Sequence, residues 1–362
     1  MRILLLNSQV APFQVELAKA INAISGVSFT IGFTHPSTRA GHWKLAADQS
    51  ACRLAPHGTT PNGLAAWLRQ LIEDERPSVI LVTGIRGAIY NAVAHYDRSA
   101  RVGFWLEQPM APRPWLYRHL RDIEYRLRLR GADFVLAIGD RALSYYQRLC
   151  PRVAMVPYGQ DLSTCLEASP PTRSRNKLRF VFSGQLVARH NIGLMIAAVE
   201  QVYDRVGPRF EFIVAAAGPH DRVIRELLER RPELRDVIHY DRDYETWEDR
   251  CRPLFSSDVL LYPSSHSGWG LVVPEAMAAG LLVISTPYVE AARFFIRDGE
   301  NGVLIPPTQA ALETQMLKCL TDPEWVRALG DRARIAARQG DAPAIANRLV
   351  DAIAALGRGT QP

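Results

Sequence analysis

The residues best suited to chemistry lie in a glycine-bearing loop and the start of the helix expected after it, residues 264–280. This segment lies between two short apolar runs, each of which predicts a buried parallel strand. Gly268 and Gly270 would let backbone amides approach an anion, and Pro274 suits a first helical turn, where its missing N–H costs no hydrogen bond. The free N–H groups and the dipole of such a helix start favour a phosphate.

Glu275 falls in the first turn of that helix. Beside a phosphate, a carboxylate is best explained by accepting hydrogen bonds from two vicinal hydroxyls, as on a ribose. The alternative is a tight strand-to-helix turn whose Glu interacts only with the helix dipole. From these residues alone both interpretations stay open.

A second candidate segment spans residues 180–192. We expect a strand to end at Gly184, and a short loop to carry Arg189 and His190 before the next helix. Cations in this loop would stabilise the charge that develops on a leaving diphosphate. The alternative is that both are ordinary polar loop residues.

The whole string Gly-Trp-Gly-Leu-Val-Val-Pro-Glu-Ala-Met-Ala-Ala-Gly at 268–280 resembles the sugar-nucleotide segment of family 4 glycosyltransferases, which have the GT-B fold. The resemblance extends from residue 178 to about 307 and is mainly architectural before that. It implies that Glu275 holds the donor ribose, that the preceding loop holds the phosphates and sugar, and that Tyr240 lies near the base. The donor-binding residues expected on this basis are Gly184, Gln185, Ser267, Gly268, Trp269, Gly270, Leu271, Val272, Glu275 and Tyr240.

Three positions depart from the family pattern. Gln185 stands where the family often has Arg, His190 where it has Lys, and Ser267 where it often has an acid, so Arg189 is the only permanent cation of its loop. Ser267 can hydrogen-bond a sugar hydroxyl but supplies no charge. Acid–base chemistry on this side would need His190 or His266.

The first half of the chain offers fewer candidates. Glu107 follows the strand expected over 102–106 and would orient or deprotonate an acceptor hydroxyl, with the alternative that it caps its loop or pairs with an arginine. Ser8 and Gln9, in the loop expected after a strand over residues 1–7, are candidates for the acceptor or the distal phosphate. With Arg189 and His190, Glu107 completes the expected catalytic set.

Alternating strand and helix patterns place these residues in two Rossmann-like domains that face a cleft, a GT-B architecture of the α/β class. The first domain is expected over residues 1–160 and the second over 178–341, joined by a polar, proline-bearing linker at 161–177. By resemblance, the last helix, 342–362, returns to the first domain. The remaining expected strands are 27–33, 79–83, 134–138, 153–156, 178–183, 210–216, 237–240, 258–262, 281–285 and 302–305. The expected helices include 15–24, 192–203, 222–229 and 310–321, and the clearest of those in the first domain are 63–74 and 141–149.

Composition limits the class of protein. The 362 residues are 48% hydrophobic and 22% charged, which suits two globular domains. No run of eighteen apolar residues occurs, and residues 1–7 are too short for a signal peptide, so we expect a cytoplasmic protein, with the inner face of the membrane as a further location. Five scattered cysteines without a Cys-x-x-Cys pair predict reduced thiols and no zinc site.

Much of the positive charge lies in residues 112–130, where six arginines alternate with apolar residues against only Asp122 and Glu124. This pattern predicts an amphipathic helix that rests on anionic lipid headgroups or guides an acidic acceptor. The alternative is a core-packed helix with a solvated arginine face. The basic residues accompany no nucleic-acid module, so no nucleic-acid partner is expected.

The resemblance implies a retaining glycosyltransferase that needs no cofactor or metal. Asp241-Arg242-Asp243 matches a metal-binding pattern of another glycosyltransferase fold, but we favour a charged loop. The expected partners are a nucleotide-sugar donor and a glycan acceptor, lipid-linked as in bacterial lipopolysaccharide or another polysaccharide. The alternatives are another GT-B enzyme, such as a sugar-nucleotide epimerase, and a non-catalytic partner of a glycan assembly system.

Overall fold

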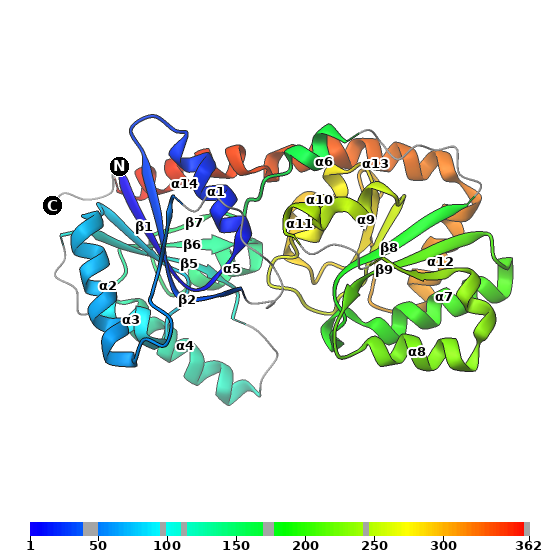
Figure 1. Cartoon of the computed structure of the whole chain (residues 1–362), viewed down its shortest axis with the longest axis horizontal. Helices are drawn as coiled ribbons and strands as arrows, with labels where there is room; N and C mark the ends of the chain where they lie inside the picture. Colours follow the sequence, from blue (N-terminus) through cyan, green and yellow to red (C-terminus); the bar gives the residue numbers. More distant parts are fainter. Residues whose placement is uncertain (39–49, 95–98, 110–113, 169–176, 242–245, 358–362) are drawn as a thin grey trace. The chain divides into compact units, whose positions relative to one another are not determined.

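The computed structural model describes residues 1–38, 50–94, 99–109, 114–168, 177–241 and 246–357 (Figure 1). The chain divides into two compact units. Unit 1 comprises Met1–Asp161 and Asp341–Pro362, and unit 2 comprises Leu162–Gly340. Each unit has one sheet in which every strand pair is parallel, with helices packed around it, so the expected α/β class with two parallel sheets is confirmed.

The sheet of unit 1 has the strand order β3-β2-β1-β4-β5-β6-β7. Its strands are β1 (Arg2–Val10), β2 (Ser28–Thr38), β3 (Cys52–Leu54), β4 (Val79–Val82), β5 (Arg101–Glu107), β6 (Phe134–Ile138) and β7 (Val153–Met155). All residues of β4 and β6 are buried. Helices cover both faces of a parallel sheet, which is why these strands are continuous apolar runs in the sequence.

Within the described residues, six helices surround this sheet: α1 (Pro12–Asn22), α2 (Pro61–Glu75), α3 (Gly87–Ala94), α4 (Trp115–Leu129), α5 (Asp140–Tyr146) and α14 (Ala342–Gly357). The last, α14, packs against α1 and β7, as the resemblance implied. A Cβ atom at Gly159 would lie 2.6 Å from Cβ of Ile345 on α14, so only glycine permits this approach. The two ends of the chain are therefore packed into one unit.

The sheet of unit 2 has the order β10-β9-β8-β11-β12-β13. Its strands are β8 (Leu178–Gln185), β9 (Phe210–Ala217), β10 (Ile238–Tyr240), β11 (Val259–Tyr262), β12 (Leu282–Ser285) and β13 (Val303–Leu304). Its α-helices are α6 (Ser163–Glu167), α7 (Ile192–Val206), α8 (Asp221–Arg230), α9 (Arg252–Phe255), α10 (Val272–Ala278), α11 (Glu290–Phe295), α12 (Gln309–Thr321) and α13 (Pro323–Ala337). Among the described residues, β8 and β11 lie at the centre of the sheet, and the two candidate loops follow them.

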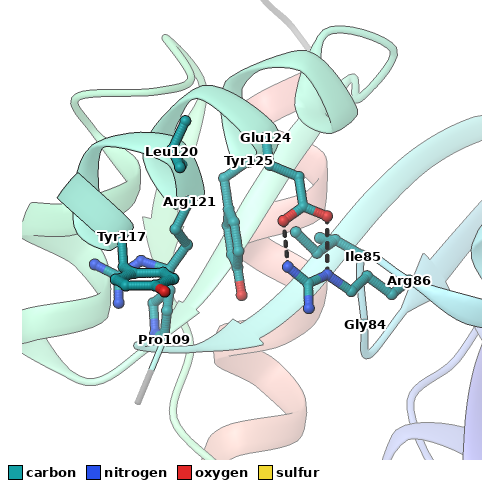
Figure 2. Close-up of a pocket in the computed structure, with 9 residues that line it drawn as sticks. All are labelled: Gly84, Ile85, Arg86, Pro109, Tyr117, Leu120, Arg121, Glu124 and Tyr125. Carbon is teal, nitrogen blue, oxygen red and sulfur yellow. Dashed lines mark hydrogen bonds and ion pairs between the residues drawn. The ribbon is translucent and has the colours of Figure 1, made fainter. Parts of the chain in front are cut away.

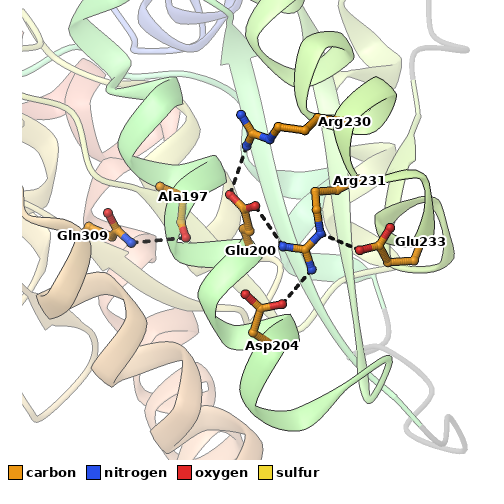
Figure 3. Close-up of polar contacts among 7 residues, drawn as sticks. All are labelled: Ala197, Glu200, Asp204, Arg230, Arg231, Glu233 and Gln309. Carbon is orange, nitrogen blue, oxygen red and sulfur yellow. Dashed lines mark hydrogen bonds and ion pairs between the residues drawn. The ribbon is translucent and has the colours of Figure 1, made fainter.

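A surface ion-pair network in unit 2 is centred on Arg231, which follows α8 (Figure 3). Its guanidinium donates to Glu200 at 3.0 Å and to Asp204 at 2.7 Å, both on α7, and also to Glu233. The side chain of Arg231 is one-quarter exposed. The network joins α7 to the segment after α8 and includes none of the candidate site residues.

The first strand differs from its expected form. β1 continues to Val10, because Gln9 pairs with His35 in β2 beyond the expected end at residue 7. Ser8 and Gln9 therefore lie in a strand and not in a loop, which corrects their predicted placement. A hydrophobic pattern underestimates a strand whose last residues are polar but still paired.

The linker and the end of unit 2 differ as well. Part of the expected linker forms α6, because Leu162 and Cys165 are buried in unit 2. α13 had not been anticipated, although Asp322 accepts a hydrogen bond from the backbone N–H of Trp325 and Pro323 follows, a helix-start pattern. Four of the five cysteines are buried and all five are free thiols. None of the helices in the described part of the chain is long and apolar enough to span a membrane.

Candidate functional site

The two candidate loops of unit 2 lie side by side because β8 and β11 are neighbours, paired at Phe180–Val259 and Val181–Leu260. Parallel strands end at the same edge of a sheet, so the loops after them meet there. The backbone N–H and the hydroxyl of Ser265 both donate to the carbonyl oxygen of Arg189, at 2.9 and 3.1 Å. The structure therefore joins two segments that the sequence predicted separately.

Two glycines shape this edge. Gly184 has φ +142° and Gly270 has φ +101°, conformations that other residues rarely adopt. A Cβ at Gly270 would also lie 2.8 Å from Cγ1 of Val289, whereas one at Gly184 would make ordinary contacts. The loop before α10 thus depends on glycine both for its backbone conformation and for space.

Arg189 presents a positive charge at this edge. Its side chain is exposed, and its guanidinium makes no ion pair or hydrogen bond with any residue that the structure describes. Gln185, at the end of β8, is exposed as well. An anion that approached this loop would find the guanidinium available.

His190 behaves differently from its neighbour. It is 2% exposed, its Nδ1 lies 2.7 Å from the hydroxyl oxygen of Ser264, and its ring centroid lies 5.0 Å from that of Tyr262. Burial lowers the pKa of His190 to about 3, so the imidazole is neutral at pH 7. His190 therefore connects the two loops and adds no charge to them.

Glu275 forms a buried ion pair with Arg250, a residue that the sequence analysis missed. The Nε of Arg250 donates to Oε1 of Glu275 at 2.7 Å, with the two side chains 9% and 7% exposed. The guanidinium also lies 4.3 Å over the ring of Trp247. Burial raises the pKa of Glu275, and the Arg250 charge opposes that shift. The two residues are 25 positions apart and follow no motif, so no sequence signal pairs them.

The other side chains of the loop before α10 are largely turned inward. Trp269 is 3% exposed and packs on Phe294 and Phe295, at centroid distances of 5.7 and 6.0 Å. Ser267 and Val272 are each 8% exposed, while Gly268, Gly270 and Leu271 are half-buried. Tyr240 lies apart from this loop, 38% exposed at the end of β10 on the sheet edge.

Unit 1 contains a pocket of about 490 Å³ beyond the carboxyl ends of β4 and β5 (Figure 2). Ligands of such sheets bind at this edge. The lining residues are Gly84, Ile85, Arg86, Pro109, Tyr117, Leu120, Arg121, Glu124 and Tyr125. Glu107 ends β5 two residues before Pro109, and its carbonyl oxygen accepts a hydrogen bond of 2.9 Å from the Tyr146 hydroxyl.

The side chains that line the pocket carry more positive than negative charge. Glu124 accepts hydrogen bonds from the Nε of Arg86 at 2.8 Å and from the Nε of Arg128 at 2.9 Å, and the Arg86 bond holds the pKa of this carboxyl below its usual value. Arg121 contacts Asp122 at 3.5 Å and lies 5.5 Å over the Tyr145 ring. Sequence analysis had identified this helix as basic but could not place its arginines around a pocket.

The other described residues that were predicted from the sequence make no observed contact with the two loops of unit 2 or with the pocket of unit 1. Ser8 is exposed on β1, and its carbonyl oxygen accepts a hydrogen bond from the Thr34 hydroxyl at 3.1 Å. Arg242 and Asp243 of the Asp-x-Asp pattern, and Arg113, lie outside the described residues. Within the described ranges, no three His, Cys, Asp or Glu side chains are grouped as ligands for a metal.

The fold and the glycine-shaped site define a class of protein. The structure resembles sucrose-phosphate synthase from Thermosynechococcus elongatus (TM-score 0.78, 17% identity, 99% of this chain and 100% of the other). It also resembles Anabaena Alr3699/HepE in complex with UDP (TM-score 0.73, 16% identity, 98% and 100%). The fold is therefore GT-B.

Part of unit 2 matches a known family of enzymes. Residues 177–322 match the model of glycosyl transferases group 1, so the predicted resemblance to a glycosyltransferase is confirmed for that segment, and the match is consistent with family 4. One relative is the UDP-N-acetylglucosamine–peptide N-acetylglucosaminyltransferase GtfA subunit of Streptococcus pneumoniae, 24% identical over 51% of this chain and 36% of that protein. Another is the lipopolysaccharide core biosynthesis glycosyltransferase LpsE of Rhizobium meliloti, 42% identical over 16% of this chain and 17% of that protein. The chain spans about a third of the length of the first three curated relatives that it matches.

Proposed function

We propose that this chain is a glycosyltransferase that moves a sugar from a nucleotide diphosphate onto a hydroxyl group of a glycan. The observation that carries the proposal is the joined pair of loops after β8 and β11, in which Arg189 is exposed beside two positive-φ glycines. Both loops lie inside the segment that matches glycosyl transferases group 1. Among the relatives, one is named for UDP-N-acetylglucosamine, so uridine diphosphate is the first base to test.

The donor would bind to unit 2 chiefly through backbone groups. The loop before α10 turns most of its side chains inward, and its glycines leave main-chain amides accessible to the phosphates. Glu275 would accept hydrogen bonds from the ribose hydroxyls through Oε2, because Arg250 occupies Oε1 and no described residue bonds Oε2. The Arg250 contact would hold the carboxylate in a single orientation and oppose the rise in its pKa that burial causes.

The reaction is proposed to retain the configuration at the anomeric carbon and to need no metal or cofactor. The bond from this carbon to the diphosphate oxygen breaks, the acceptor oxygen forms the new bond on the same face, and the acceptor proton passes to the departing phosphate. Arg189 would stabilise the negative charge that grows on the diphosphate. The neutral His190 would hold the loop geometry and transfer no proton.

The acceptor is proposed to bind to unit 1 in the pocket beneath α4. Arg86 and Arg121 would favour an acceptor with phosphate or carboxylate groups, such as a lipopolysaccharide core or another lipid-linked glycan. Glu107, at the end of β5, remains the candidate for orienting the acceptor hydroxyl. Ser8 and Gln9 remain acceptor-side candidates on β1.

A nucleotide panel tests the donor half of this proposal. UDP, GDP, ADP, CDP and dTDP would each be added to the purified chain, and the preferred nucleotide should raise the melting temperature in a concentration-dependent way. The matching sugar nucleotides would then be incubated with a lipopolysaccharide-core acceptor, and the glycoside would be detected by mass spectrometry. If none of the five nucleotides changes the melting temperature, the proposal is wrong.

A second candidate is a GT-B protein that binds nucleotide without transferring sugar. The small positive charge at the site favours this candidate. His190 is neutral, so Arg189 is the available cation of its loop for stabilising a leaving diphosphate. Binding of a nucleotide without any product over the full donor panel would support it. Conversion of the sugar nucleotide itself, without an acceptor, would instead indicate an epimerase.

A further inference from the structure

Most of the apolar residues of helix α4 are exposed, on the side of the helix away from α5. Asp122 and Tyr125 contact α5: the Tyr145 hydroxyl donates to Asp122 at 2.6 Å, and the Tyr125 and Tyr145 ring centroids are 5.9 Å apart. Leu129 belongs to the hydrophobic core of unit 1. Leu129 is the only buried residue of this helix. These positions recur at intervals of three and four and so form one face of the helix.

The opposite face is apolar and exposed, in contrast to an ordinary surface helix, which turns its apolar stripe inward. It holds Leu116, Leu120, Ile123 and Leu127, spaced by four, three and four residues, with Trp115 and Tyr117 in the first turn. Tyr117 and Leu120 lie at its border, because they also line the pocket of unit 1. We call these six residues the α4 apolar face. Their exposed fractions are 70% for Trp115, 51% for Leu116, 57% for Tyr117, 56% for Leu120, 51% for Ile123 and 54% for Leu127.

Nothing comparable occurs elsewhere in the described part of the chain. The other exposed large apolar side chains, Leu54, Tyr240, Tyr288 and Ile335, occur singly on separate segments. In Figure 1, α4 runs along the lower edge of unit 1, and one of its ends projects beyond the sheet. The alternative of a core-packed helix with a solvated arginine face is therefore wrong for α4.

Positive charge borders the α4 apolar face. Arg126 and Arg130 project beside the face, both are exposed, and neither makes a side-chain hydrogen bond or ion pair with a described residue. The acids of this helix are engaged: Asp122 bonds Tyr145, and Glu124 bonds Arg86 and Arg128. The charge available at the surface of the helix is thus positive.

We propose that α4 docks unit 1 onto an anionic lipid bilayer, with its axis along the membrane surface. Leucine, isoleucine and the aromatic rings would enter the boundary between headgroups and acyl chains, and Arg126 and Arg130 would contact lipid phosphates. The 15 residues of α4 form a rod about 22 Å long, which suits a helix that lies on a membrane and is too short to cross it.

Charge argues against a second copy of the chain as the occupant. Pairing two α4 apolar faces would bring Arg126 and Arg130 of both copies into one poorly solvated interface, with no uncommitted acid on α4 to neutralise them. An anionic bilayer supplies the missing negative charge together with an apolar layer. The proposal depends on α4 alone and holds whether or not the chain transfers a sugar.

Sedimentation with vesicles tests the proposal on the full chain without any substrate. One set of vesicles is an equimolar mixture of phosphatidylglycerol and phosphatidylcholine, and the other is phosphatidylcholine alone. The protein should sediment with the anionic vesicles, bind the neutral ones at least tenfold more weakly, and lose anionic binding as salt rises. Failure to sediment with anionic vesicles at low salt would overturn the proposal.

Two variants separate the apolar and ionic contributions. Ile123→Ser with Leu127→Ser should reduce binding to the anionic vesicles at least tenfold, and Arg126→Gln with Arg130→Gln should reduce it on the order of tenfold. The matched controls in unit 2 are Ile335→Ser on α13 and Arg222→Gln with Arg235→Gln, all at exposed positions, and these should bind as the parent does. Equal losses in test and control variants would contradict docking through α4.

Folding and self-association are checked on the same samples. The α4 variants should keep the parent melting temperature because the replaced side chains are exposed. Size-exclusion chromatography should give one elution volume for the parent and the Ile123→Ser, Leu127→Ser variant. A parent dimer that this variant dissociates, combined with unchanged vesicle binding, would identify the α4 apolar face as a contact between copies and overturn the proposal.

Discussion

Arg250 and Glu275 form a buried ion pair at the start of α10, with 2.7 Å between Nε and Oε1 and both side chains less than one-tenth exposed. Burial raises the pKa of the Glu275 carboxyl, and the neighbouring guanidinium opposes that rise. The same carboxylate is our candidate for the donor ribose. Glu275 thus has two roles here: it stabilises unit 2 through the ion pair, and it is proposed to bind the donor.

We expect Glu275→Gln and Arg250→Gln each to lower the free energy of unfolding by about 3–5 kcal/mol. Each substitution removes one partner of a buried pair and leaves the charge of the other partner buried without compensation. The double variant should lose less than the sum of the two, because the charges are removed together. Urea unfolding of the four proteins measures this cycle. Replacing Glu324, which faces Arg327 at 3.8 Å on the surface, is the control and should change stability little. Additive losses at 250 and 275 would contradict the coupling.

The ribose role of Glu275 predicts a loss of affinity that the ion pair alone does not explain. Glu275→Ala should weaken binding of the preferred nucleoside diphosphate by about 2 kcal/mol, roughly thirtyfold, because it removes charge-assisted hydrogen bonds. Calorimetry measures the affinity. Arg250→Gln breaks the same pair but keeps the carboxylate, so its loss should be clearly smaller, and equal losses would make Glu275 a structural residue only.

Arg189 is expected to act on turnover. Its side chain is exposed and makes no hydrogen bond or ion pair with a described residue, so Arg189→Ala should leave the melting temperature nearly unchanged. We expect kcat to fall by about a hundredfold while KM for the donor changes only a few fold, because the charge on the diphosphate grows as the bond breaks. Steady-state kinetics with the identified donor checks this. A rise in KM at constant kcat would indicate uniform binding and argue against transition-state stabilisation.

His190 predicts a pH dependence of stability. Its pKa is lowered to about 3 in the folded state from 6.5, so below pH 6.5 the unfolded chain binds a proton that the folded chain does not. The free energy of unfolding should therefore fall as the pH drops from about 6.5 toward 3, by about 3 kcal/mol at pH 4.5 from this residue.

His190→Gln can keep a hydrogen bond to Ser264 and should lack this contribution. Urea unfolding of parent and variant from pH 7.5 to 4.5 gives the difference. Glu275, whose pKa is raised, acts in the opposite direction but is present in both proteins and cancels. Parallel pH profiles of parent and variant would show that His190 is not buried as a neutral group.

Much of the architecture could be predicted from local patterns. The apolar run of β6 matches its expected bounds, and β4, β5, α7 and α12 differ from theirs by a few residues at most. Buried parallel strands carry their signal in consecutive residues, and glycine at 184 and 270 marks backbone conformations that only glycine adopts easily. The match of residues 177–322 to a known family rests on the same local strings. The local patterns did not predict β3, α6 or the last residues of β1, because tertiary contacts stabilise these segments and their own sequences carry only a weak signal.

The sequence by itself determined which residues follow each strand, and so which side chains could reach the edge of each sheet. Only the tertiary structure decided what those side chains do there: Arg250 pairs with Glu275, His190 is buried against Ser264, and Arg189 stays exposed one residue away. It also decided that the apolar stripe of α4 faces outward. Periodicity shows that a helix has two faces. Which face is buried depends on contacts with distant segments, here with Tyr145 on α5, and a local pattern does not contain those contacts.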